Sequence, residues 1–148
     1  MTRRGEMAVA IARRWIGTPY RHQATCEGAG CDCLGLLRGV WRDLYAVEPE
    51  LVPHYSPDWS EPQGEELLLE AASRWLIAKP IDAEAAGDVL LFRMRSGGVA
   101  KHLGLQSETD VGAAFVHSYD RHGVIESPLS EPWRRRIVAR FAFPEETA

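Results

Sequence analysis

The sequence predicts an α+β protein in which N-terminal helices pack on an antiparallel meander sheet. Two observations support this fold class. Up to Ala78, apolar residues recur at helical spacing, and from Val89 onward short β-branched and aromatic runs alternate with turn residues. A length of 148 residues suits one domain with its own core, which we expect to span residues 1–148.

Three helices are predicted: residues 6–16, a helix that starts at Cys33, and residues 65–78. Gly17 and Pro19 end the first helix, and Asp32 is a suitable N-cap for the second. The inward faces are predicted to be Met7, Ile11 and Trp15 in the first helix, Leu37, Val40, Trp41 and Leu44 in the second, and Leu68, Ala71, Ala72 and Trp75 in the third.

The strands follow as the runs VLLFRM, HLGLQS, AAFVHSY, GVIESPL and RRIVARFAF. Strands joined by such short connections pair with their neighbours in the chain, which predicts a meander. In the last run, the arginines of WRRRIVAR are predicted to alternate outward from an edge strand.

Charge and hydropathy argue against several classes of protein. The net charge is −4 and the pI is about 5.7, so we expect neither nucleic acid nor an anionic membrane as the main partner. No apolar run approaches the roughly 18 residues that a membrane span needs. Arg13 and Arg14 interrupt the apolar N-terminal segment and no small-residue cleavage site follows, so we expect no signal peptide and synthesis in the cytoplasm.

Cys33 is a candidate nucleophile because it opens the second predicted helix. A helix N-terminus carries unpaired N–H groups and the positive end of the helix dipole, which favour the thiolate. The same N–H groups can stabilise an oxyanion that forms beside the sulfur. The alternative for this residue alone is a small buried apolar side chain.

A cysteine nucleophile needs a base, and the base needs an orienting group. His102 and His117 lie among apolar residues in consecutive predicted strands, which can place the two imidazoles side by side. The other histidines, His22, His54 and His122, fall in loops and turns and are interpreted as solvated. This pattern favours a Cys–His–His arrangement over two unrelated core histidines.

Zinc is the main competing interpretation of the cysteines. Cys26, Cys31 and Cys33 with one histidine would supply four ligands, but their spacing is not that of a common zinc knuckle. A disulfide between Cys26 and Cys31 would be a local clasp in the loop. A zinc-binding module therefore stays an alternative to the nucleophile.

The motifs GTPYRHQ, CDCLGLLRGVW, GDVLLF, KHLGLQ and FVHSYDRHGVIESPL, in this order, resemble the NlpC-type cysteine peptidases that cut bacterial cell-wall peptides. With PHYSPDW and PWRRRIVARFAFP, the chain is more narrowly similar to the subgroup found in tails of phages and of phage-derived gene transfer agents. The resemblance extends over nearly the full length.

The resemblance implies a reduced papain-like fold and assigns roles by motif. The Asp-Cys-x-Gly motif begins at Asp32 and makes Cys33 the nucleophile. Position 34 is leucine here, where many relatives have serine, but the residue at this position need not take part in chemistry. His102 becomes the base and His117 the third polar residue. Tyr20, after the Gly-x-Pro turn, is expected near the sulfur and the oxyanion, with Asp32 beside it.

The implied activity is hydrolysis of amide bonds in peptidoglycan stem peptides, of the type that joins D-glutamate to a diamino acid, without a metal or organic cofactor. The implied partners are tail hub or tip proteins. The implied location is a phage-like tail particle that acts at the cell wall during DNA delivery. Two further alternatives are a structural tail protein with weak or latent activity, and a thiol amidase or acyltransferase of the same fold.

Overall fold

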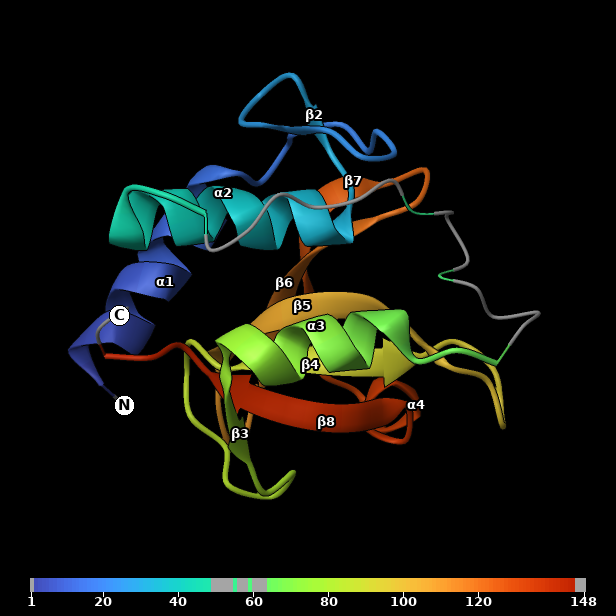
Figure 1. The fold of residues 1–148 in the computed structure, drawn as a ribbon. Coiled ribbons are helices and arrows are strands. Elements are labelled where there is room, and N and C mark those ends of the chain that lie inside the picture. The colour runs from blue at the N-terminus through green and yellow to red at the C-terminus, as the bar shows by residue number, and fades with distance from the viewer. Residues whose placement is uncertain (1, 49–54, 56–58, 60–63, 146–148) are drawn as a thin grey trace.

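The structure of the protein is a computed structural model that describes residues 2–48, 55, 59 and 64–145. Three helices, α1 (Arg3–Arg14), α2 (Cys33–Tyr45) and α3 (Leu67–Trp75), pack on an antiparallel sheet (Figure 1). This arrangement confirms the predicted α+β class. None of the helices within the described ranges is long and apolar enough to cross a membrane.

The sheet has the spatial order β3-β8-β4-β5-β6-β7, and every neighbouring pair is antiparallel. Its strands are β3 (Ile77–Lys79), β4 (Val89–Arg93), β5 (Ala100–Glu108), β6 (Ala114–Tyr119), β7 (Gly123–Pro128) and β8 (Ile137–Ala142). The part from β4 to β7 is the predicted meander. A two-stranded hairpin, β1 (Thr25–Cys26) with β2 (Gly30–Cys31), precedes α2, and a short helix, α4 (Glu131–Arg134), precedes β8.

The helix ends follow local capping. Helix α1 begins at Arg3 rather than at residue 6, because the Thr2 hydroxyl accepts a hydrogen bond from the Gly5 N–H. Within α1 the buried face is formed by Ala8, Val9, Ile11 and Ala12, whereas Met7 is 41% exposed, so its predicted inward position was wrong. In α2, Leu36 is fully buried, whereas the predicted Leu37 and Leu44 are only partly buried against the core.

The third helix ends earlier than predicted, and this changes the sheet. Helix α3 stops at Trp75, which is 37% exposed rather than inward, and Leu76 turns to extended backbone. Ile77–Lys79 then forms β3, an edge strand that pairs with β8. Strand β8 therefore lies inside the sheet, so the prediction of an edge strand with outward arginines was wrong: Arg140 is 1% exposed.

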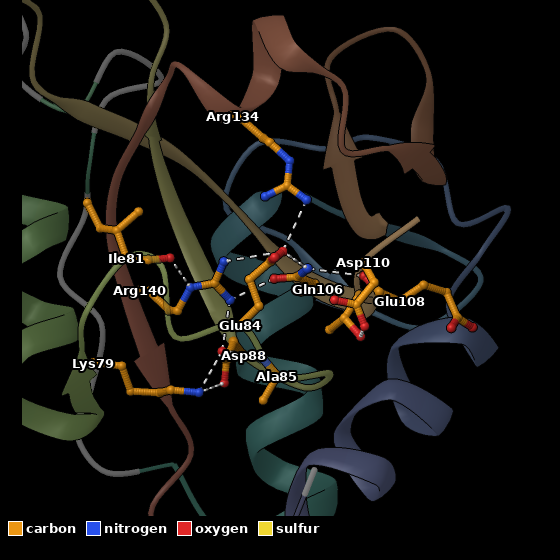
Figure 2. Close-up of polar contacts among 11 residues, drawn as sticks. Lys79, Ile81, Glu84, Ala85, Asp88, Gln106, Glu108, Asp110, Arg134 and Arg140 are labelled. Atoms are coloured by element: carbon orange, nitrogen blue, oxygen red, sulfur yellow. Dashed lines mark hydrogen bonds and ion pairs between the residues drawn. The ribbon is translucent and has the colours of Figure 1, made fainter. Parts of the chain in front are cut away.

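Arg140 belongs to a buried ionic cluster of Lys79, Glu84, Asp88, Gln106 and Arg140, whose side chains point toward one another in Figure 2. Arg140 Nη1 donates to Asp88 at 2.8 Å and to Gln106 at 2.6 Å, and Lys79 Nζ reaches the same Asp88 carboxylate at 2.8 Å. The cluster ties β3, β4, β5 and β8 together, because Lys79, Gln106 and Arg140 come from β3, β5 and β8, and the loop before β4 supplies Glu84 and Asp88.

The apolar core has two parts, one on each face of the sheet. The helices cover the larger part, which contains Leu36 and Val40 of α2 and the inward side chains of β4, β5 and β6. The smaller part contains Phe92 and Phe115, and Trp133 of α4 packs against it. The alternating burial that defines the two faces also decides on which face each strand histidine lies.

Candidate active site

The N-terminus of α2 opens into a cleft of about 450 Å³ that the ends of β5 and β6 complete. The cleft is lined by Tyr20, His22, Asp32, Cys33, Tyr55, Trp59, Met94, Lys101, His102, Ser118, Tyr119, Asp120, Arg121 and His122. Cys33 and His102 thus face one hollow, although 69 positions in the chain, from 33 to 102, separate them.

Asp32 holds the start of α2 in place. Its carboxylate accepts hydrogen bonds from the Gly35 N–H at 2.7 Å and from the Gln23 N–H at 2.6 Å, and the Tyr55 hydroxyl donates to it as well. Gly35 is required because a Cβ there would lie 1.8 Å from the Ala24 carbonyl oxygen. The Asp-Cys-x-Gly motif therefore has a packing reason as well as a chemical one. All of these hydrogen bonds are made with other residues of the chain. A contact of Asp32 with the oxyanion or with the substrate therefore stays a prediction.

The Cys33 sulfur lies against the backbone of β5 on both sides of His102. Sγ is 4.0 Å from the Lys101 carbonyl oxygen, and the backbone N–H groups of Leu103 and Leu34 hydrogen-bond to it. Burial, and then the negative charge of Asp32, raise the pKa of Cys33 to about 12, although the two N–H groups act in the opposite direction. The helix N-terminus thus favours the thiolate as predicted, through the Leu34 N–H, but burial and Asp32 outweigh it.

His102 and His117 meet as predicted. Their rings are joined by a hydrogen bond of 2.7 Å between His102 Nε2 and His117 Nδ1, which leaves Nδ1 as the nitrogen of His102 that can address a thiol. Gly104 makes room for this pair, since a Cβ there would lie 3.1 Å from His117 Cβ and 2.7 Å from a ring carbon of Phe115. The glycine of the His-x-Gly pattern therefore has a structural reason: a side chain at position 104 would clash with the neighbouring strand.

The histidine pair is shielded from water. His102 is 6% exposed and His117 is fully buried, and the ring of Trp133 lies 5.8 Å and 5.3 Å from their rings. Burial, reinforced by the neighbouring His117, lowers the pKa of His102 well below its usual value, and burial lowers that of His117 to about 4. Both rings are therefore neutral at pH 7, and His102 and the neutral Cys33 thiol line the same cleft.

Tyr20 lines the same cleft, and an isolated bridge to Cys31 holds its backbone. Burial and the nearby Cys33 raise the pKa of Tyr20, so its hydroxyl remains a donor. His22 is not merely solvated as predicted, because it lines the cleft and bonds the Tyr55 carbonyl oxygen at 2.9 Å. His122 is exposed but also lines the cleft, and His54 falls outside the described residues.

The three cysteines are free and do not converge. Thr25 pairs with Cys31 across the hairpin, so the side chain of Cys26, the next residue, lies on the other face; Cys26 is exposed and Cys31 is buried. Neither the clasp nor a zinc site that uses all three sulfurs fits this geometry. Among the residues that the structure describes, no group of three His, Cys, Asp or Glu side chains is placed to hold a metal ion.

Sequence reasoning missed three side chains around the site: Tyr55, Ser127 and Trp133. Tyr55 bonds Asp32, Ser127 bonds His117 at 2.9 Å, and Trp133 covers both histidines. Trp133 carried a weak signal, as a tryptophan in a predicted loop. Tyr55 and Ser127 lie in the motifs PHYSPDW and FVHSYDRHGVIESPL, but nothing in these motifs indicated their roles, because the contacts that distinguish them are made with residues elsewhere in the chain.

The fold is that of the NlpC/P60 domains. The structure is similar to a Staphylococcus aureus protein described as similar to lipoprotein, of the NLP/P60 family, with a TM-score of 0.66 and 16% identity over 99% of this chain and 43% of that one. It is similar to the NlpC/p60 domain of the peptidoglycan hydrolase SagA, with a TM-score of 0.63 and 20% identity over 94% of this chain and 98% of that one.

A Bacillus cereus protein of the NlpC/P60 family gives a TM-score of 0.63 and 19% identity, over 92% of this chain and 39% of that one. This chain therefore spans less than half the length of the Staphylococcus and Bacillus proteins. The sequence matches no protein-family model and no curated protein. At these identities the likeness defines the class of fold, an NlpC/P60 papain-like domain.

Proposed function

We propose that this chain belongs to the NlpC family and is a cysteine endopeptidase that hydrolyses amide bonds in peptidoglycan stem peptides. The observation that carries the proposal is that Cys33 lies against β5 beside His102, which is in turn hydrogen-bonded to His117, at one open cleft. The order of the motifs resembles that family, and the fold is shared with the domain of a peptidoglycan hydrolase.

The protonation states define the mechanism. Because both groups are neutral, His102 Nδ1 removes the thiol proton as Sγ bonds to the amide carbonyl carbon, rather than from a preformed ion pair. The Cys33 N–H, which has no acceptor within the helix, and the Tyr20 hydroxyl donate to the oxyanion. The proton on His102 then passes to the leaving amine as the C–N bond breaks. Water, deprotonated by His102, cleaves the thioester and restores the thiol. No step uses a metal or an organic cofactor.

The scissile bond that we propose joins D-glutamate to a diamino acid, on the basis of the sequence resemblance. The test is incubation of the purified protein with peptidoglycan fragments of known structure and mass spectrometry of the products. We expect a gain of one water and a new amine on the diamino acid. Products in which the amide has been exchanged or an acyl group transferred would instead favour a thiol acyltransferase. Products in which the fragment has lost ammonia or an amino sugar would favour an amidase.

Two variants test the assignment of the residues. Cys33→Ala and His102→Ala should abolish cleavage with an unchanged circular dichroism spectrum, because each removes an atom that forms or breaks a bond. Cys26→Ala is the matched control, since this thiol is exposed and outside the cleft lining. Turnover that survives Cys33→Ala would contradict the mechanism.

A structural tail protein with latent activity is the second candidate. The observation that favours it is that Cys33 is only 6% exposed and its pKa is raised to about 12, so the sulfur is not activated in the free chain. Alkylation of Cys33 by iodoacetamide at neutral pH separates the candidates. An active site should label faster in the wild type than in His102→Ala, whereas a latent site should label slowly in both.

We further propose that the chain acts as a component of a phage or gene-transfer-agent tail and helps the tail to penetrate the cell wall. The support is the resemblance of PWRRRIVARFAFP, which forms α4 and β8, and of PHYSPDW, of which only Tyr55 and Trp59 lie within the described residues. Proteomics of purified tail particles from the source strain should find the chain at a fixed ratio to the hub proteins. Its absence from intact particles would refute this role.

A further inference from the structure

We propose that Ser127 is a positioning residue that supplies the acceptor for the His117 N–H and thereby allows the tautomer in which His102 can accept the Cys33 proton. This inference rests on the proposed function, because it assigns a part in the same reaction to a residue that does not touch the reacting atoms. It begins from one contact, the hydrogen bond of 2.9 Å between His117 Nε2 and Ser127 Oγ.

The three side chains form a line across three neighbouring strands. His102 is on β5, His117 on β6 and Ser127 on β7. Ser127 pairs with Phe115, two residues before His117 on β6, so the contact is a diagonal one of the kind that an imidazole can span. The line continues through the hydrogen bond of 2.7 Å from His117 to His102 and ends at the cleft.

Each neutral imidazole carries one N–H, so the line has only two arrangements of its protons. In the first, His102 donates from Nε2 to His117 Nδ1, and His117 donates from Nε2 to the Ser127 oxygen. In the second, His117 donates from Nδ1 to His102 Nε2, and His102 then carries its proton on Nδ1. Only the first arrangement leaves a lone pair on His102 Nδ1, the nitrogen that must take the thiol proton.

The first arrangement needs Ser127 because His117 is fully buried. In the first arrangement the His117 Nε2–H needs an acceptor, and an unmet buried N–H is destabilising. The serine oxygen is that acceptor. In the second arrangement the serine O–H can donate to the bare His117 Nε2 instead, so the hydroxyl serves either arrangement, but only the first leaves a buried donor unmet when the hydroxyl is removed. In the absence of the hydroxyl, the second arrangement becomes the favoured one, and His102 loses its function as a base.

The matched test pair is Ser127→Val and Ser127→Thr. The two side chains have the same shape, both suit a strand, and they differ only by a methyl group and a hydroxyl. We expect Ser127→Val to lower kcat about tenfold, the equivalent of one neutral hydrogen bond, with little change in KM, and Ser127→Thr to restore it. Ser130→Ala is a control for a serine in the same region, because its side chain makes no capping hydrogen bond.

The decisive readout does not depend on activity. Long-range 15N–1H NMR of the imidazoles, recorded in the Cys33→Ala background, reports which nitrogen of each histidine is protonated. We expect the proton of His117 on Nε2 with serine or threonine at position 127, and on Nδ1 with valine. An unchanged tautomer in Ser127→Val would overturn the inference while leaving the proposed peptidase intact. A tautomer change in a protein that cleaves no peptidoglycan fragment would instead retain the positioning role and reject the proposed function.

Discussion

Replacement of Asp88 by asparagine tests the ionic cluster that holds the sheet together. Asp88 is 3% exposed and is the shared acceptor for Arg140 Nη1 at 2.8 Å and for Lys79 Nζ at 2.8 Å. Asparagine keeps the shape of the side chain but removes the charge. Arg140, which is 1% exposed, would then keep its positive charge with Gln106 as a neutral partner and Glu84 4.0 Å away.

Loss of one partner from a buried pair of charges costs about 3–5 kcal/mol. For a domain of this size that corresponds to a fall in Tm of roughly 6–20 °C. The partly exposed Lys79 can turn toward solvent, so Arg140 accounts for most of the loss. The double variant Asp88→Leu with Arg140→Met, which removes both charges, should be more stable than Asp88→Asn, because it leaves no buried charge without a partner.

The measurement is the free energy of unfolding from urea titration, with peptidase activity measured alongside it. Glu131→Gln is the matched control, since Glu131 and Arg135 form a pair at 3.7 Å with 67% and 72% of their side chains exposed. Loss of this exposed ion pair should lower the free energy of unfolding by less than about 0.5 kcal/mol. A cost for Asp88→Asn as small as that of the control would refute the reasoning that the cluster holds the sheet together.

Three further predictions concern the histidine pair. First, the free energy of unfolding should fall as the pH drops from 6.5 toward 4, by up to about 1.4 kcal/mol per pH unit for each buried histidine, because the unfolded chain binds protons that the folded state does not. His117 has a folded-state pKa of about 4, so His117→Gln should flatten this slope in urea titrations at pH 7 and pH 5; equal slopes contradict the assignment. Second, Trp133→Ala should raise the pKa of His117 toward 6.5 in an NMR titration, since it lets water reach the rings; an unchanged value would mean that other side chains provide the shielding. Third, Gly104→Ala places a Cβ 2.7 Å from Phe115 and should cost about 1–3 kcal/mol in urea titrations while it separates His117 from His102, and wild-type stability would show that the strands can yield there.

The residues to which we assign the proposed chemistry were predictable because their signals are local. Asp32 is a preferred N-cap residue, and the structure shows it accepting the Gly35 N–H at the start of α2, which places Cys33 in the first turn. Alternation along two consecutive strands predicted that His102 and His117 meet, and the hydrogen bond of 2.7 Å between them confirms it. Neighbouring strands and helix caps depend on residues a few positions apart, so a sequence carries them directly.

Other features depended on partners distant in the chain. Ile77–Lys79 leave the helical pattern to pair with β8, and this pairing makes β8 an interior strand, in which Arg140 bonds Asp88. The protonation of Cys33 likewise followed from burial, which outweighs the effect of the helix N-terminus that its position predicted.

By itself, the sequence determined the class of fold, the start of α2 and the pairing of two imidazoles, since each follows from short-range periodicity or capping. Only the tertiary structure decided which charge is buried, how acidic the thiol is and which hydroxyl reaches His117 Nε2. Burial and hydrogen bonding of a side chain are set by everything packed around it, and for Cys33, Arg140 and Ser127 those neighbours come from other strands and helices.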